Sequence, residues 1–245
     1  MTTTAARMKT VLSWSGGKDS ALALHALLTD PTVEVCGLLT TATSGYDRVS
    51  MHGVRMSLVQ EQATAIGLPL DWVHNPPSAS NADYERVMIE GLSKLTDEGV
   101  EAIAFGDLFL EDVRAYRERL ASSVPIRPLF PIWGKSTASL ARSFIRDGFR
   151  ATLVCVDPRQ IDVSHCGSPY DDALLDALPE TVDPCGEHGE FHTFVYDAPM
   201  FSTPIGAQRG EVVERSGFVF CDLLPGDVPR ATCGDASRGG TRPAL

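Results

Sequence analysis

No stretch of this 245-residue sequence is apolar for long enough to cross a bilayer, which takes about 20 residues. The first ten residues, MTTTAARMKT, have no apolar core like that of a secretory signal peptide, so we expect no export and no membrane association. The six cysteines are scattered, and none forms a CxxC pair. This cysteine usage is typical of a reduced protein, and we expect a cytoplasmic location.

Positive charge is also scarce. The chain has 21 Lys and Arg residues against 32 Asp and Glu residues, a net charge of −11, and no basic run gathers a local patch. An acidic surface repels nucleic acid, so we do not expect a nucleic-acid partner. The hydrophobic fraction of 43% is that of an ordinary globular protein, and the length suits one large domain or two small ones.

Short apolar runs alternate with amphipathic stretches in the first half of the chain. The pattern predicts strands at 10–14, 33–43, 70–75 and 100–107. It predicts helices at 19–30, 53–68 and 81–99, the last one capped by Asn81 and ended by Gly99. Alternation of strands and helices favours an α/β fold with a doubly wound, mostly parallel sheet.

The alternation of strand and helix patterns is interrupted near residues 123–131, where prolines gather, and we place a domain boundary there. The second half shows one helix at 136–147 and strands at 150–156, 189–198 and 210–224, which predicts a second, smaller α+β domain. The predicted domains are 8–124 and 130–224. The stretch 225–245 is poor in apolar residues and is predicted to be a disordered tail.

The sequence WSGGKDS follows the first predicted strand and leads directly into a helix. Its glycines permit a sharp turn and let a ligand approach the backbone, and the N–H groups at the helix start form an anion site. Ser15 and Ser20 add hydroxyl donors, and Lys18 adds positive charge. Asp19 either caps the helix or helps to hold Mg²⁺ against phosphates. A plain glycine-rich turn capped by Asp19 is the alternative.

This stretch resembles the SGGxDS signature of the PP-loop ATP pyrophosphatases, which cleave ATP between its α and β phosphates. The resemblance implies a HUP-like fold with ATP beyond the carboxyl ends of the strands, Mg²⁺ as a cofactor, and Lys18 and Asp19 as catalytic residues, Asp19 also as a metal ligand. The nucleotide-binding residues that it implies are Ser13, Ser15, Gly16, Gly17, Lys18, Asp19 and Ser20, with Trp14 beside them. The stretch after the second predicted strand then lies beside the adenosine, which makes His52 and Arg55 candidates, although both also suit a surface loop and helix start.

Acidic side chains follow the fourth predicted strand. Asp107 ends this strand, and Glu111 and Asp112 come shortly after it. In a doubly wound sheet Asp107 lies at the same edge as the glycine-rich turn, where a carboxylate can bind Mg²⁺ or position an amine. Helix capping by Asp107 is the structural alternative. Given the resemblance, we favour a catalytic role for Asp107.

The stretch CGEHGEFHTFV, residues 185–195, crowds ionisable side chains around two glycines. One interpretation is a metal site, for which the spacing offers Cys185, His188, His192, His165 and Cys166. Another is a substrate pocket that binds a cationic group or ammonia, with the candidates Glu187, Glu190, His192 and Thr193. A regular strand directs Glu190 and Thr193 to opposite faces, so one pocket can hold both only with a bulge or bend. A polar loop before a core strand is the third interpretation.

The motifs SGGKDS, GDLFLED, PIWGKS and CGEHGEFHTFV occur together and in this order. As a set they resemble the diphthine–ammonia ligase family over roughly residues 9–224. The resemblance implies that ATP adenylates the diphthine carboxylate of elongation factor 2, that pyrophosphate leaves, and that ammonia displaces AMP. Elongation factor 2, another protein acceptor and a second copy of the chain are the partners it leaves open. The family pattern has a small or amide-bearing residue where this chain has His188.

Two other functions remain open at this point. A PP-loop enzyme that modifies a tRNA base is one, although the acidic balance and the lack of a CxxC pair count against it. A sensor that binds ATP or AMP without turnover is the other, although the complete glycine-rich motif favours turnover.

Overall fold

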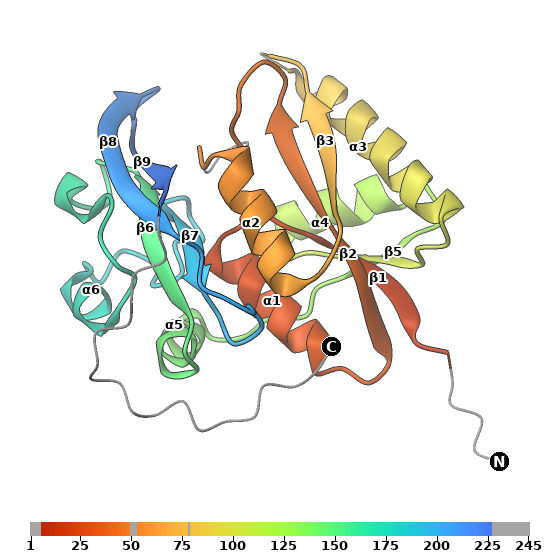
Figure 1. Ribbon diagram of the computed structural model, residues 1–245, viewed down its shortest axis with the longest axis horizontal. Helices are drawn as coiled ribbons and strands as arrows, with labels where there is room; N and C mark the ends of the chain where they lie inside the picture. Colours follow the sequence, from red (N-terminus) through yellow and green to blue (C-terminus); the bar gives the residue numbers. More distant parts are fainter. Residues whose placement is uncertain (1–5, 50–52, 78, 227–245) are drawn as a thin grey trace.

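The structure is a computed structural model that describes residues 6–49, 53–77 and 79–226. It contains two sheets with helices between and around them (Figure 1). No helix within these ranges is both long and apolar enough to cross a membrane. His52 and most of the predicted tail, residues 227–245, lie outside the described residues.

The first sheet is entirely parallel and has the strand order β3-β2-β1-β4-β5. Its strands are β1 (Met8–Ser13), β2 (Val33–Thr43), β3 (Leu70–Asn75), β4 (Ala102–Ala104) and β5 (Arg127–Leu129). The strand order reverses between β1 and β4, because β2 and β3 lie on one side of β1 and β4 and β5 lie on the other. In open parallel sheets the crevice at such a reversal, beyond the carboxyl ends of the strands, is where ligands bind.

Four helices cover this sheet, two on each face (Figure 1). They are α1 (Lys18–Leu28), α2 (Met56–Ile66), α3 (Asn81–Asp97) and α4 (Glu111–Ala121). The helices α3 and α4 close a core of their own with one face of the sheet. The helices α1 and α2 lie on the other face, toward the second sheet, so apolar side chains cover both faces as the doubly wound prediction requires.

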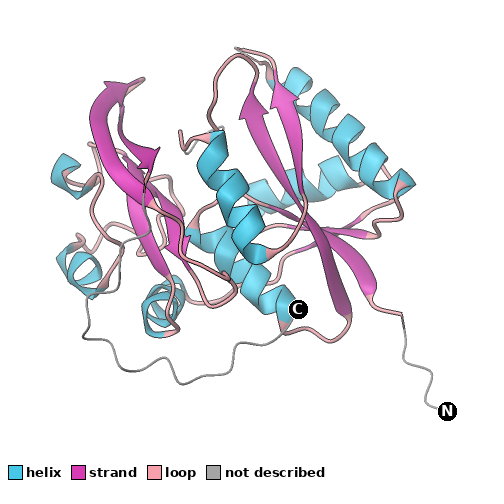
Figure 2. Ribbon diagram, viewed as in Figure 1, coloured by secondary structure: helices cyan, strands magenta, loops and turns pink. Residues whose placement is uncertain are grey.

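The second sheet has the order β7-β6-β9-β8, and its strand pairs are antiparallel. Its strands are β6 (Arg150–Val156), β7 (Phe191–Asp197), β8 (Ala207–Arg215) and β9 (Phe218–Pro225). The helix α5 (Thr137–Arg146), the 3₁₀ turn η1 (Val163–His165) and α6 (Asp172–Ala177) accompany this sheet (Figure 2). One continuous apolar core joins it to α1 and α2, so the two sheets are packed against a shared layer of helices.

The predicted fold class is confirmed, with several corrections in detail. The helix α3 is capped by Ser80, whose hydroxyl accepts from the Asp83 amide, and not by Asn81. The helix α1 begins after Gly17 without a side-chain cap, so the predicted capping role of Asp19 is wrong. The predicted strand at 210–224 is a hairpin, because Ser216 and Gly217 adopt φ values of 53° and 80° and reverse the chain. The first sheet extends to Leu129, slightly past the residue 124 at which we end the predicted first domain.

Candidate functional site

The turn between β1 and α1, residues 14–20, is held by a buried glutamine. Gln62 on α2 is fully buried, and its amide nitrogen donates to the carbonyl of Gly16 at 3.0 Å. The indole nitrogen of Trp14 donates to the amide oxygen of Gln62 at 3.0 Å. Gly16 has a φ of +78°, and a Cβ there would lie 2.8 Å from that same oxygen. Glycine is therefore required at this position, both for its backbone conformation and for space.

The second sheet supplies the other wall of the turn. The backbone amide of Lys18 donates to Thr193 Oγ1 on β7 at 3.1 Å, and the amide of Val195 donates to the carbonyl of Gly16 at 2.9 Å. Gln62 Nε2 also donates to the carbonyl of Val195, at 2.6 Å. Two elements distant in sequence, α2 and β7, thus fix the conformation of one short turn, which is the form that a rigid binding loop needs.

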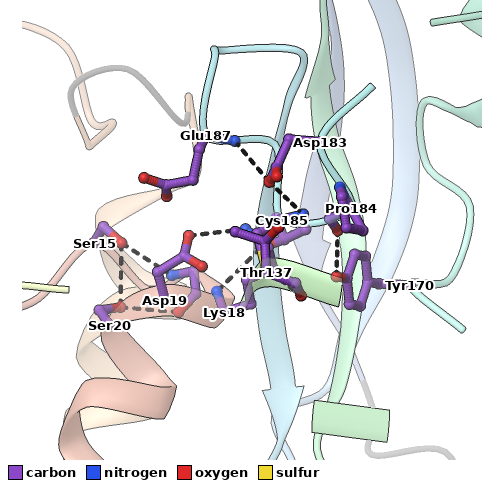
Figure 3. Close-up of polar contacts among 12 residues, drawn as sticks. Ser15, Lys18, Asp19, Ser20, Thr137, Tyr170, Asp183, Pro184, Cys185 and Glu187 are labelled. Carbon is purple, nitrogen blue, oxygen red and sulfur yellow. Dashed lines mark hydrogen bonds and ion pairs between the residues drawn. The ribbon is translucent and has the colours of Figure 1, made fainter. Parts of the chain in front are cut away.

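The hydroxyl groups of the turn form a short chain of hydrogen bonds (Figure 3). Ser15 Oγ lies 3.1 Å from Ser20 Oγ and accepts from the amide of Gly17 at 3.2 Å. Ser20 Oγ donates to the carbonyl of Gly17 at 2.9 Å. Because the first amides of α1 have no partner within the helix, this end of α1 carries positive partial charge and suits an anion.

Lys18 and Asp19 form an ion pair at the start of α1, with Nζ and Oδ2 2.8 Å apart. Lys18 is 2% exposed. Burial alone would lower its pKa, but the adjacent Asp19 carboxylate, together with Cys185 and Glu187, outweighs burial and raises the pKa above its usual value, so Lys18 stays charged. Burial raises the pKa of Asp19, against the opposing effect of Lys18. The other carboxylate oxygen of Asp19 has no hydrogen-bond partner among the described residues.

Asp107 follows β4 and faces Arg117 of α4, with Oδ2 and Nε 3.5 Å apart. This is an ion pair without hydrogen-bond geometry, because neither atom has a hydrogen-bond partner in the described part of the chain. Burial raises the pKa of Asp107, and nearby Asp19 adds to the rise. A Cβ on Gly106 would lie 2.9 Å from the backbone of Asp19, so the glycine brings the two acidic segments together. Asp107 does not cap α4, whose N-cap is Leu110.

Glu187 comes from the loop before β7, and its carboxylate is directed toward Ser15 and Asp19 (Figure 3). Burial, with the nearby Asp19 carboxylate, raises the pKa of Glu187 to about 7. Asp107 is predicted to lie at the same edge as the turn, and the structure also brings Glu187 close to Lys18, Asp19 and Asp107, although these residues come from three separate segments. A carboxyl group that titrates near neutrality can accept or release a proton under ordinary conditions.

Glu190 has a different environment from Glu187. Its side chain is fully buried and accepts from the backbone amides of Asp183 and His188, each at 2.9 Å. It therefore organises the loop that carries Glu187. Glu190 lies just before β7, whereas Thr193 lies within β7 and contacts the turn. The two residues therefore do not sit together in one regular strand, and the predicted conflict between opposite strand faces does not apply to them.

The histidine and cysteine candidates do not form a metal site. In the described ranges no group of three or more His, Cys, Asp or Glu side chains is arranged to hold a metal ion, so the interpretation based on Cys185, His188 and His192 is wrong. The Cys185 thiol donates to the carbonyl of Thr137 at 3.4 Å, and burial raises its pKa to about 12. Burial, with a smaller effect of Lys18, lowers the pKa of His192 to about 4, which keeps this ring neutral.

A pocket of about 600 Å³ opens beside the turn, at the carboxyl ends of β1, β2 and β3. Its walls include Ser13, Trp14, Ser15, Thr41, Asn75 and Arg117. Asp112 also lines it, whereas Arg55 lies apart from it and pairs with Asp222 at 2.7 Å. The position beside the anion-binding turn and the concave shape suit a nucleoside attached to phosphates.

Comparison with known proteins agrees with this geometry. Residues 8–128 match the family described as the diphthamide synthase N-terminal domain, and residues 136–222 match the diphthamide synthase C-terminal domain. The chain belongs to the diphthamide synthase family. This confirms the family resemblance drawn from the four motifs, and the diphthamide synthase assignment extends over both sheets.

Several similar proteins carry the name diphthine–ammonia ligase. This diphthamide synthase family member is 27% identical to the protein from Bos taurus over 189 residues. The aligned region covers 74% of this chain and 70% of the relative. The identity to the Danio rerio protein is 27% over 236 residues, with 88% of this chain and 92% of the relative covered. The Schizosaccharomyces pombe protein is 26% identical over 234 residues, which span 88% of this chain but 39% of the relative.

The diphthamide synthase site fits a magnesium ion held mainly by its substrate. Mg²⁺ in nucleotide enzymes takes one or two carboxylates together with phosphates, and does not need a cage of protein ligands. Asp19 offers a buried carboxylate oxygen that has no hydrogen-bond partner among the described residues. Asp19 lies close enough to raise the pKa of Asp107, which offers a second oxygen without a hydrogen-bond partner in the described part of the chain.

The residues of α2, α3 and α4 that support this diphthamide synthase site leave little signal in the sequence. Gln62 and Arg117 sit in ordinary amphipathic helices, where nothing in the spacing separates a buried polar anchor from a surface residue. Tyr84 is a third such residue, since its hydroxyl accepts from Arg117 Nη1 at 3.3 Å. Asn75 offered one signal, because it ends a strand at the predicted ligand-binding edge.

Proposed function

We propose that this chain is an ATP-dependent, amide-forming ligase that adenylates a carboxylate, transfers ammonia to it, and releases AMP and pyrophosphate. The observation that carries the proposal is the convergence of the anion-binding turn, the nucleoside-sized pocket and Glu187 at one sheet edge. The names of the relatives support the same reaction class, and they indicate diphthine as the acceptor.

The turn would receive the β and γ phosphates of ATP. In the first step an acceptor carboxylate oxygen attacks the α phosphorus, and the bond from that phosphorus to the bridging oxygen of the β phosphate breaks. Negative charge then builds on the departing pyrophosphate. The backbone amides at the start of α1, the hydroxyls of Ser15 and Ser20, and the ammonium of Lys18 are positioned to stabilise that charge.

The product of this step is an acyl adenylate, a far better acyl donor than a free carboxylate. Ammonia attacks its carbonyl carbon, the bond to the AMP oxygen breaks, and a proton must leave the new amide nitrogen. Glu187 suits this role because its pKa of about 7 leaves a large deprotonated fraction at neutral pH. Asp107 lies near enough to Glu187 to share the binding of an ammonium ion before it is deprotonated.

A bound Mg²⁺ would neutralise phosphate charge, and Asp19 is the residue that would hold it. Trp14 and Gln62 keep the turn in its binding conformation whether or not metal is present. All the residues in this scheme come from one chain, so the proposal does not require a second copy. The acceptor carboxylate would belong to a larger molecule. The family resemblance indicates that this molecule is elongation factor 2.

The experiment incubates the protein with ATP, Mg²⁺, ¹⁵N-ammonium and elongation factor 2 that carries diphthine. Phosphorus NMR identifies the nucleotide products, and mass spectrometry locates the label. The proposal predicts AMP, pyrophosphate and one ¹⁵N atom in the acceptor. Formation of ADP and phosphate, or AMP formation without any labelled acceptor, would contradict it.

A further inference from the structure

The pocket beside the turn has an unsatisfied amide in its wall. Asn75 is the last residue of β3, it is 6% exposed, and it lines this pocket. Its side-chain oxygen has no hydrogen-bond partner in the described part of the chain. A buried polar atom without a partner costs free energy, and native proteins seldom keep one unless water, a ligand or a functional role accounts for it. The pocket therefore offers an acceptor atom with no structural use.

The position of Asn75 relative to the turn matches one end of a nucleotide. Neighbouring strands in a sheet lie about 4.8 Å apart, and β3 is two places from β1, so the end of β3 lies about 10 Å from the turn along the edge. Thr41 of the intervening strand lines the same pocket. A nucleotide whose terminal phosphates occupy the turn would run along this edge and present its base near Asn75.

The other walls near Asn75 suit a flat ring. Tyr84 of α3 and Tyr116 of α4 line the pocket, and their rings are 6.4 Å apart and inclined by 31°. Aromatic surfaces stack on any base and do not distinguish one base from another. Selection among bases must therefore come from a directional hydrogen bond, and a side-chain amide is suited to adenine because it offers an acceptor and a donor side by side.

Resting on the proposed function, we propose that Asn75 determines the base specificity of this ligase by accepting a hydrogen bond from the 6-amino group of adenine. With the Asn75 oxygen facing the base, hypoxanthine and guanine present a carbonyl oxygen at that position, and the two acceptors repel. In this orientation of the amide Asn75 selects ATP against ITP and GTP, whereas the turn selects only for the phosphates.

The test measures the dissociation constants of ATP and ITP by titration calorimetry for the wild type, Asn75→Leu and Asn75→Ala. The matched control is Gln60→Leu, which removes an exposed side-chain amide of α2 that does not line the pocket. We expect the wild type to prefer ATP by about tenfold or more, as one buried hydrogen bond allows. Both Asn75 variants should bind ATP about tenfold more weakly, bind ITP at least as tightly as the wild type does, and keep the melting temperature of the wild type.

Three outcomes would overturn the assignment. An unchanged ratio of ATP to ITP affinity in the Asn75 variants, with both nucleotides still bound, would exclude Asn75 as the residue that determines base specificity. The proposed function would then remain intact. A lower melting temperature for both variants would show that the amide stabilises the fold. A wild type that binds neither nucleotide would remove this inference together with the proposed function.

Discussion

The backbone amide of Lys18 donates a hydrogen bond to Thr193 Oγ1 at 3.1 Å across 175 positions of sequence. Lys18 belongs to the glycine-rich turn of the first sheet, and Thr193 lies within β7 of the second. The second sheet therefore does more than add a pocket wall, because it fixes the conformation of the turn itself.

Replacement of Thr193 tests this link. Thr193→Val keeps the shape of the side chain but removes the acceptor, which leaves the buried amide of Lys18 without a partner. The free energy of unfolding should fall by about 1–3 kcal/mol, and pyrophosphate release should fall with it. Thr193→Ser keeps the hydroxyl and serves as the control. Chemical denaturation and a pyrophosphate assay make the measurement, and wild-type turnover in Thr193→Val would contradict the link.

Lys18 should be essential for turnover but not for folding. Lys18→Met replaces the ammonium with an apolar chain of similar length, and the Phe191 ring, 5.5 Å from Nζ, remains as a packing partner. Loss of this charge from the departing pyrophosphate should lower the rate of pyrophosphate release by about a hundredfold or more. The matched control is Lys94→Met, an exposed lysine of α3 whose loss should change nothing. Circular dichroism verifies that both variants are folded, and equal rates would exclude Lys18 from the site.

Glu187 should make the protein less stable as the pH rises. Burial, and then Asp19, raise its pKa from 4.5 to about 7, so the folded protein binds a proton that the unfolded chain has released. The stability of the wild type relative to Glu187→Gln should fall as the pH rises from about 4.5 to 7 and stay level above that range. Thermal unfolding at a series of pH values makes the measurement. A constant difference across the range would show that Glu187 ionises normally.

Glu190→Gln should have a structural effect that Glu187→Gln does not have. The Glu190 carboxylate accepts from two backbone amides, and the amide nitrogen of a glutamine would face one of them. The free energy of unfolding should fall by about 1–3 kcal/mol, because a buried N–H loses its acceptor. Denaturant unfolding of the two variants side by side makes the comparison. A Glu190→Gln protein as stable as the wild type, but with less amide product, would instead favour direct substrate contact.

Asp222 on β9 joins the hairpin of the second sheet to the loop after β2. Arg48 and Arg55 bind its two oxygens at 2.8 and 2.7 Å. Burial opposes ionisation of Asp222, but these hydrogen bonds outweigh it and hold the pKa at about 2. Its contribution to stability should be present above pH 4 and be lost as the pH falls toward 2. Asp222→Asn should lower the free energy of unfolding by about 1–2 kcal/mol at neutral pH and by progressively less in acid, as denaturant unfolding at several pH values would measure.

Much of the fold follows from local sequence patterns. The strands β2 and β3 have the predicted bounds, because apolar and β-branched residues end there at clear turn signals. The hairpin of β8 and β9 was missed because its turn, Ser216 and Gly217, interrupts a continuous strand pattern without the usual asparagine. The family motifs led to Lys18, Asp19, Asp107 and Glu187, which the structure brings together.

The supporting residues could not be found in the same way. Gln62 contacts Trp14, Gly16 and Val195, which are far from it in sequence, so its role exists only in the folded chain. The separate environments of Glu187 and Glu190 have the same origin. The two carboxylates are three positions apart, yet one is satisfied by backbone amides and the other is directed at the turn.

The central claim is that the turn at residues 15–20 binds the terminal phosphates of ATP and leaves the α phosphorus open to attack. The most direct measurement is a crystal structure with Mg²⁺ and an ATP analogue that cannot be cleaved between its α and β phosphates. The account predicts β and γ phosphates on the amides of the turn, Lys18 beside them, and the nucleoside in the pocket lined by Trp14 and Asn75. A triphosphate bound away from the turn, or reversed so that the base occupies it, would contradict the account.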